Sequence, residues 1–157
     1  MGEVHRLEAS DPSFGLQAAG RLLHQIFAPW VQDLALLVES VEALRPPGAS
    51  PDWQPGAVVR LPFSKNICAG GDVVCSQALM ALADTAMVIA CSAAWNGYRP
   101  MSTIDQTTHF LRPVHFDCIA DARVVRIGRN TSFGRVMLLG APDRRPVGMV
   151  AGAYATA

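Results

Sequence analysis

The sequence has no excess of charge of either sign and no cysteine spacing typical of a known site. Its 13 Lys and Arg side chains balance 13 Asp and Glu side chains, so it lacks the basic footprint of a nucleic-acid-binding protein. Its four cysteines form no Cys-x-x-Cys pair and have no metal-ligand spacing with the four histidines. We therefore expect no metal site and interpret the cysteines as reduced, mostly buried thiols.

Internal repeats, low-complexity tracts and interdomain linkers are also absent, which predicts a single domain over residues 1–157. Half of the residues are apolar (50%), enough for a core that needs no disulfide or metal to fold. The residues after Met1 form no apolar segment of the signal-peptide kind. Together with the cysteine usage, this leads us to expect a cytoplasmic protein.

The most informative feature that is present is one acidic residue, Asp84, inside an apolar run from Ala78 to Cys91. The run is rich in Ala, Leu and Met and contains neither Gly nor Pro, so it predicts a helix that is apolar on all sides and buried. A buried carboxylate is costly unless it is hydrogen-bonded, paired or neutralised. The residues alone leave two interpretations open: an Asp satisfied by its neighbours, or a carboxylate that performs chemistry.

The same apolar stretch continues to Trp95 and is long enough to raise the question of a membrane span. Its central Asp84, the polar Thr85 and Ser92, and the lack of basic flanks favour a core helix instead. We therefore expect no association with a membrane.

Before this helix, the pattern is less uniform. Apolar positions at helical spacing predict an N-terminal helical extension, about residues 12–30, that starts at the cap-like pair Asp11-Pro12. Residues 34–43 could continue as helix, but they also alternate well enough to be a strand. Both possibilities stay open at this point.

Five strands are predicted around the long helix, four of them after it. The segment 117–127 places small apolar side chains on one face and most charges on the other, which is typical of a half-buried sheet. The connections in the second half are too short for crossover helices, so neighbouring strands should be antiparallel. One long buried helix against one curved antiparallel sheet defines an α+β fold. The predicted strands cover residues 57–61, 102–110, 117–127, 135–139 and 147–154.

Three segments together resemble a known family: Cys-Ser-Gln-Ala-Leu-Met-Ala-Leu-Ala-Asp-Thr-Ala at 75–86, Thr-Ile-Asp at 103–105 leading into Phe-Leu-Arg-Pro at 110–113, and Arg-Ile-Gly-Arg at 126–129. The sequence is similar to the hotdog-fold acyl-CoA thioesterases of the phenylacetate-pathway and hydroxybenzoyl-CoA branches over about its last hundred residues. The resemblance implies a long helix wrapped by a strongly bent antiparallel sheet. It also implies an acyl-CoA substrate, no cofactor, and a homodimer or homotetramer with its active site at the subunit interface.

The resemblance also implies roles for particular residues. Asp84 matches the catalytic carboxylate, which acts as general base on water or as nucleophile on the thioester carbonyl. The family has a His-Gly-Gly segment at the helix start, where this sequence has Cys75, Ser76 and Gln77. The backbone N–H of Gln77 would still stabilise the oxyanion, whereas the side chains of Ser76 and Gln77 would narrow the approach of the substrate. Thr103 matches a position that helps to orient water.

Other interpretations of the same residues remain. Cys75 near a helix start could be a nucleophile, although no His with suitable context accompanies it. Arg126 and Arg129, near Arg123 and Arg135 in the sequence, could bind coenzyme A phosphates or could be solvated charges on a sheet. Because the His-Gly-Gly segment is replaced, the alternative function is a weak or inactive hotdog protein that binds an acyl-thioester or serves as a partner subunit.

Overall fold

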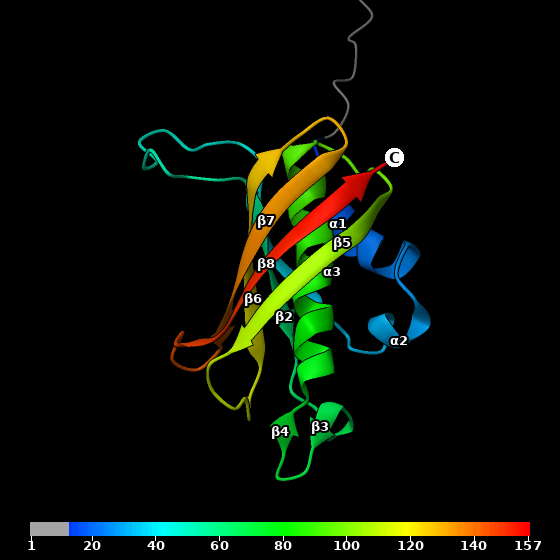
Figure 1. Ribbon diagram of the computed structural model, residues 1–157, viewed down its shortest axis with the longest axis vertical. Coiled ribbons are helices and arrows are strands. Elements are labelled where there is room, and N and C mark those ends of the chain that lie inside the picture. The colour runs from blue at the N-terminus through cyan, green and yellow to red at the C-terminus, as the bar shows by residue number, and fades with distance from the viewer. Residues whose placement is uncertain (1–12) are drawn as a thin grey trace, which may run out of the picture.

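The computed structural model describes residues 13–157, and its N-terminal part contains two short helices. Helix α1 spans Leu16–Gln25 and buries Ala19, Leu22 and Leu23, while α2 is a single turn at Pro29–Gln32 with proline at its first position. Both lie on one side of the domain, beside the long helix (Figure 1). The predicted helical extension is therefore present in two pieces. Its expected cap at Asp11-Pro12 lies outside the described residues.

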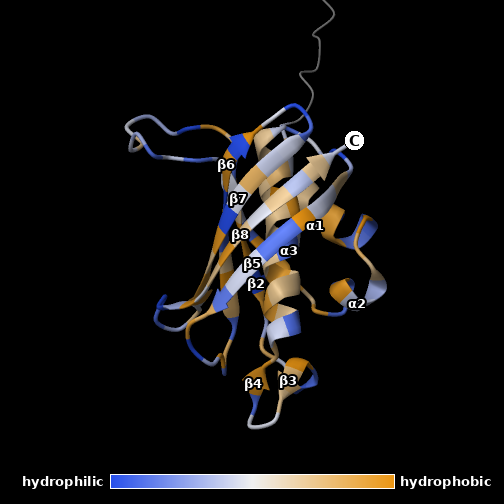
Figure 2. Cartoon of the chain, viewed as in Figure 1, coloured by the Kyte–Doolittle hydropathy of each residue, from blue (hydrophilic) through white to orange (hydrophobic). Residues whose placement is uncertain are grey.

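Helix α3, Ser76–Ala94, is the centre of the fold. Its 19 residues give a length of about 28 Å at about 1.5 Å per residue. Most of its side chains are buried, and Figure 2 shows that much of the helix is apolar. Its length and composition would also suit a membrane span, but the burial is that of a core helix. The expectation that the run Ala78–Cys91 is buried on all sides is wrong at Met80, which is exposed, and at Asp84, which is half-buried.

A bent sheet of six strands wraps around α3 (Figure 1). All pairs of neighbouring strands are antiparallel. The ambiguous residues 34–43 contain a strand, and the other five strands lie where the sequence predicts them. Four of these are longer than predicted, whereas β6 begins one residue later. The order of the strands across the sheet is β1 (Leu37–Glu42), β2 (Gly56–Leu61), β6 (Cys118–Ile127), β7 (Thr131–Gly140), β8 (Pro146–Thr156) and β5 (Met101–Phe110).

The strands β5 and β6 follow one another in the chain but do not pair. β5 lies at one edge of the sheet beside β8, whereas β6 lies at its centre between β2 and β7. The short link between them, residues 111–117, can cross from the edge to the centre because the sheet is bent around the helix (Figure 1). This topology leaves β5 as an edge strand, with Ile104 and Phe110 among its exposed side chains.

A small hairpin fixes the start of α3. Strands β3 (Cys68–Ala69) and β4 (Val73–Val74) pair after the single 3-10 turn η1 (Lys65–Ile67). The Cys75 N–H donates to the Ile67 carbonyl at 2.8 Å, and the Val74 N–H donates to the Val114 carbonyl at 2.8 Å. The first turn of α3 is thereby tied to the hairpin and to the link after β5.

Two glycines that face each other on β7 and β8 make room in the core. A Cβ atom on Gly134 would lie 2.0 Å from Cε of Met87, and one on Gly152 would lie 2.6 Å from the hydroxyl of Tyr154. Met87 and Tyr154 are fully buried, at 0% and 1% exposure. The two glycines therefore let large side chains pack directly on the sheet backbone.

Candidate active site

Asp84 is half-buried on α3 and has one side-chain partner, Thr103 on β5. The Thr103 hydroxyl Oγ1 donates to Asp84 Oδ1 at 2.7 Å. Burial raises the pKa of the Asp84 carboxyl, and the hydrogen bond from Thr103 opposes that effect without cancelling it. A carboxylate with a raised pKa beside a hydroxyl is suited to accept a proton from water near neutral pH.

A β-bulge in the edge strand brings Thr103 to the helix. Thr103 pairs with Tyr154 and Asp105 pairs with Ala153, so Ile104 is an extra residue in β5. As a result, Thr103 and Gln106 both contact α3, although they are three positions apart. The side-chain amide of Gln106 donates to the Met80 carbonyl at 3.2 Å. Two hydrogen bonds therefore fasten this part of β5 to the helix.

Asp84 and Thr103 border an open cleft of about 350 Å³. The surface of the cleft is mostly apolar, since thioether, methyl and indole groups surround the single carboxylate. Its volume is within the usual range for small-molecule sites. The cleft is lined by Trp30, Gln77, Met80, Ala81, Asp84, Thr103 and Gln106.

A second cavity, of about 500 Å³, lies at the start of α3. Its lining includes Cys75, Ser76 and Gln77 and residues 110–114. Gln77 borders both this cavity and the cleft at Asp84. Its backbone N–H belongs to the first helical turn, whose amides have no acceptor within the helix and carry the positive end of the helix dipole. This N–H is therefore available to the carbonyl oxygen of a ligand.

The family model described as the thioesterase superfamily matches residues 78–146, which include Asp84, Thr103 and the strands β5 to β7. This chain has the hotdog fold. Comparison with curated protein sequences gives no significant match.

Several solved structures have the same fold. The PaaI protein of the Escherichia coli phenylacetic acid degradation operon is 19% identical, with a TM-score of 0.71 over 90% of this chain and 91% of that one. A Haemophilus influenzae thioesterase is 17% identical, with a TM-score of 0.73 over 93% and 92% of the two chains. A conserved Pseudomonas aeruginosa protein is 23% identical, with a TM-score of 0.69 over 85% and 98%.

The hotdog fold does not bring Arg126 and Arg129 to the cleft within one protomer. Arg126 lies near the end of β6, and Arg129 lies in the turn between β6 and β7. In that turn the Asn130 carbonyl accepts from the Thr156 N–H at 3.0 Å, and the Ala157 N–H reaches the Pro100 carbonyl, just beyond the end of α3, at 3.3 Å. The two arginines therefore lie near the carboxyl end of α3, whereas Gln77 lies at its amino end. A role in binding coenzyme A phosphates stays a prediction.

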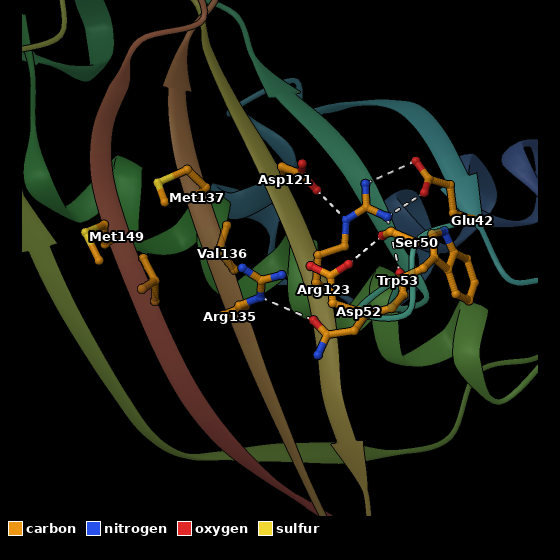
Figure 3. Close-up of a pocket in the computed structure, with 12 residues that line it drawn as sticks. Glu42, Ser50, Asp52, Trp53, Asp121, Arg123, Arg135, Val136, Met137 and Met149 are labelled. Atoms are coloured by element: carbon orange, nitrogen blue, oxygen red, sulfur yellow. Dashed lines mark hydrogen bonds and ion pairs between the residues drawn. The ribbon is translucent and has the colours of Figure 1, made fainter. Parts of the chain in front are cut away.

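Arg123 and Arg135 belong to a different feature, a cavity of about 430 Å³ on the outer face of the sheet (Figure 3). Arg123 forms ion pairs with Glu42 and Asp121, which raise the pKa of its guanidinium further above its usual range. Arg135 donates to the side-chain oxygen of Gln54 at 3.2 Å. These contacts tie the loop between β1 and β2 to the sheet, so the structure gives Arg123 a structural role.

The cysteines divide into two classes. Cys91 and Cys118 are buried in the core, and burial raises the pKa of each thiol to about 12. Cys68 and Cys75 are half-buried near the start of α3, and all four are free thiols. Cys75 is the residue that precedes α3, but its side chain makes no capping hydrogen bond.

Four residues of the cleft, Trp30, Met80, Ala81 and Gln106, were not among the candidates from the sequence. Met80 could have been found, because it precedes Asp84 by four positions and therefore lies on the same face of the helix. Gln106 depends on the bulge in β5, and Trp30 comes from a helical turn far from Asp84 in the sequence. Neither has a local signal in the sequence.

Proposed function

We propose that this protein is an acyl-CoA thioesterase that hydrolyses an acyl-CoA to the free acid and coenzyme A, with Asp84 as its catalytic carboxylate. The observation that carries the proposal is the hydrogen bond between Thr103 and Asp84, in an apolar cleft of a hotdog fold. The match to the thioesterase superfamily supports a thioesterase-like activity. The acyl-CoA substrate and the residue roles are our inference.

In the proposed reaction Asp84 removes a proton from water as the water oxygen attacks the thioester carbonyl carbon. The negative charge that develops on the carbonyl oxygen is stabilised by the backbone N–H of Gln77. The C–S bond then breaks, coenzyme A leaves as a thiolate and takes up a proton, and Thr103 keeps the carboxylate oriented. Direct attack by Asp84, followed by hydrolysis of the anhydride, would use the same groups. The raised pKa of Asp84 favours the role of base.

The position of the two groups on α3 supports a site that two subunits share. Gln77 and Asp84 are seven residues apart, which corresponds to about 10 Å along the helix axis. One carbonyl group cannot receive a hydrogen bond from Gln77 and also meet a water held by Asp84 at that separation. A second copy, antiparallel to the first, would place Gln77 of one subunit beside Asp84 of its partner. The exposed edge strand β5 offers a surface for such pairing.

A survey of hydrolysis over short, medium, long and aromatic acyl-CoAs tests the proposal directly, with released thiol as the readout. We expect turnover by the wild type and a loss on the order of hundreds or more for Asp84→Asn. Equal rates for the two proteins would show that Asp84 is structural.

The alternative function, an acyl-thioester binder or partner subunit with little activity, is favoured by the exposed side chains at the helix start. The Ser76 hydroxyl and the Gln77 side-chain oxygen lie 3.3 Å apart and occupy the place of the family's two glycines. If they hinder the substrate, restoring glycine at both positions should raise kcat/KM. A wild-type kcat/KM on the order of 10⁵ M⁻¹s⁻¹, with no gain in the glycine variant, would eliminate this alternative.

A further inference from the structure

Trp30 is an exposed aromatic residue whose position the core does not explain. It is 58% exposed, so its large apolar ring is available for contact with a ligand. Its neighbours Phe27 and Val31 pack against the core. Trp30 itself lines the cleft that contains Asp84 and Thr103.

The turn that carries Trp30 is held firmly. Pro29 begins α2, the Val31 N–H donates to the Ala28 carbonyl at 2.9 Å, and the Gln32 side-chain amide donates to the Phe27 carbonyl at 2.8 Å. The indole is therefore presented by a fixed backbone, so a ligand that contacts it would not have to order a loop. Met80 lines the same cleft and is also exposed, at 38%.

We propose that Trp30 determines acyl-group specificity, because its indole forms a wall of the subsite that receives the apolar part of the acyl chain next to Asp84. This inference rests on the proposed thioesterase function and names the part of the site that selects the substrate. The indole, the Met80 thioether and the Ala81 methyl bury the chain, while Asp84 and Thr103 act at the carbonyl end. The substrate class is therefore an acyl-CoA with an apolar acyl group that is long enough to reach the indole.

Burial of successive methylene groups against Trp30 gives the inference a measurable signature. Each methylene removed from water should increase kcat/KM about fourfold as the chain lengthens from acetyl-CoA toward octanoyl-CoA. In Trp30→Ala this increment should fall to less than about twofold, since one wall is gone. Trp30→Phe should recover most of it. Trp53→Ala is the matched control, because Trp53 lines the cavity on the outer face of the sheet.

The four proteins are compared in the same acyl-CoA series, with sedimentation and thermal unfolding measured on each. A loss of chain-length dependence in Trp30→Ala alone, with an unchanged oligomer and fold, is the expected result. Equal slopes in all four proteins would overturn the inference and leave the thioesterase proposal intact. Dissociation of Trp30→Ala into smaller species would also overturn it, because Trp30 would then be a subunit contact.

If the wild type hydrolyses no acyl-CoA, the proposed function fails, and the role of Trp30 is decided by binding. Non-hydrolysable thioether analogues of the same chain lengths are then titrated into the wild type and Trp30→Ala. A Kd that tightens with chain length only in the wild type would support an acyl subsite at Trp30. Equal Kd values in the two proteins would overturn it.

Discussion

Replacement of Asp84 by Asn should make the protein more stable while it abolishes hydrolysis. Asn has nearly the same shape, and its side-chain oxygen can still accept the hydrogen bond from Thr103. The change removes a negative charge that burial disfavours. Burial of that charge is also what raises the pKa of Asp84. Stability should therefore increase while hydrolysis decreases, because the charged carboxylate is needed for the reaction and destabilises the folded state.

The expected size follows from linkage. Since the pKa of Asp84 is higher in the folded than in the unfolded protein, the folded state binds the proton more tightly between these two values. The free energy of unfolding therefore decreases as the pH rises through that interval, and the full penalty is present at neutral pH. Each pKa unit between the folded and unfolded values corresponds to about 1.4 kcal/mol, so the gain measured for Asp84→Asn reports the size of the shift. In a chain of this length, a gain of about 1 kcal/mol raises the Tm by about 2–4 °C.

The assay is thermal or urea unfolding of the two proteins at neutral pH and at about pH 4, near the ordinary Asp value, at one protein concentration. The stability gain should be largest at neutral pH and should shrink in acid, where the wild-type carboxyl is protonated. Asp105→Asn, at an exposed carboxylate beside the same bulge, is the control and should change little. A less stable Asp84→Asn, or a gain that does not depend on pH, would refute the reasoning.

Four further outcomes are expected. Thr103→Val removes a hydrogen bond that lowers the Asp84 pKa, so the acid limb of the pH profile of kcat/KM should move to higher pH, and Thr103→Ser should restore it. Gly152→Ala should cost about 1–3 kcal/mol in urea unfolding because its Cβ meets the Tyr154 hydroxyl, whereas Gly70→Ala, with open space around it, should cost little. Cys75→Ala should leave hydrolysis nearly unchanged, and a large loss would favour the thiol mechanism. Sedimentation at micromolar concentration should show a dimer or tetramer, and a monomer would contradict the shared active site.

The sequence predicts the elements of the fold better than their pairing. Helix α3 has a long apolar run without Gly or Pro, and β6 has a clear alternation, so both are visible from local pattern. Residues 34–43 were ambiguous because a short apolar run fits either a helix or a strand. Pairing with β2 makes part of this segment the strand β1. The pairing of β5 with β8 depends on how the sheet bends around the helix, and no local segment encodes it.

The candidate site divides in the same way. Asp84 could be identified because a carboxylate in an apolar helix is an exception that needs a cause. Thr103 was a candidate only through the family resemblance, and its hydrogen bond to Asp84 comes from the three-dimensional structure. Trp30 and Gln106 are brought to the cleft by chain segments that are distant in sequence, so periodicity and spacing could not identify them.

The bulge at Ile104 also determines which changes of length the edge strand β5 can accept. On the far side of the extra residue, the inward and outward faces of the strand are exchanged relative to a regular strand. Deletion of Ile104 would restore strict alternation and turn either Thr103 or Gln106 away from α3. Conservative replacement of the exposed Ile104 side chain should be tolerated, while loss of the residue itself should not. The cleft therefore depends at this position on the number of residues in the strand more than on their identity.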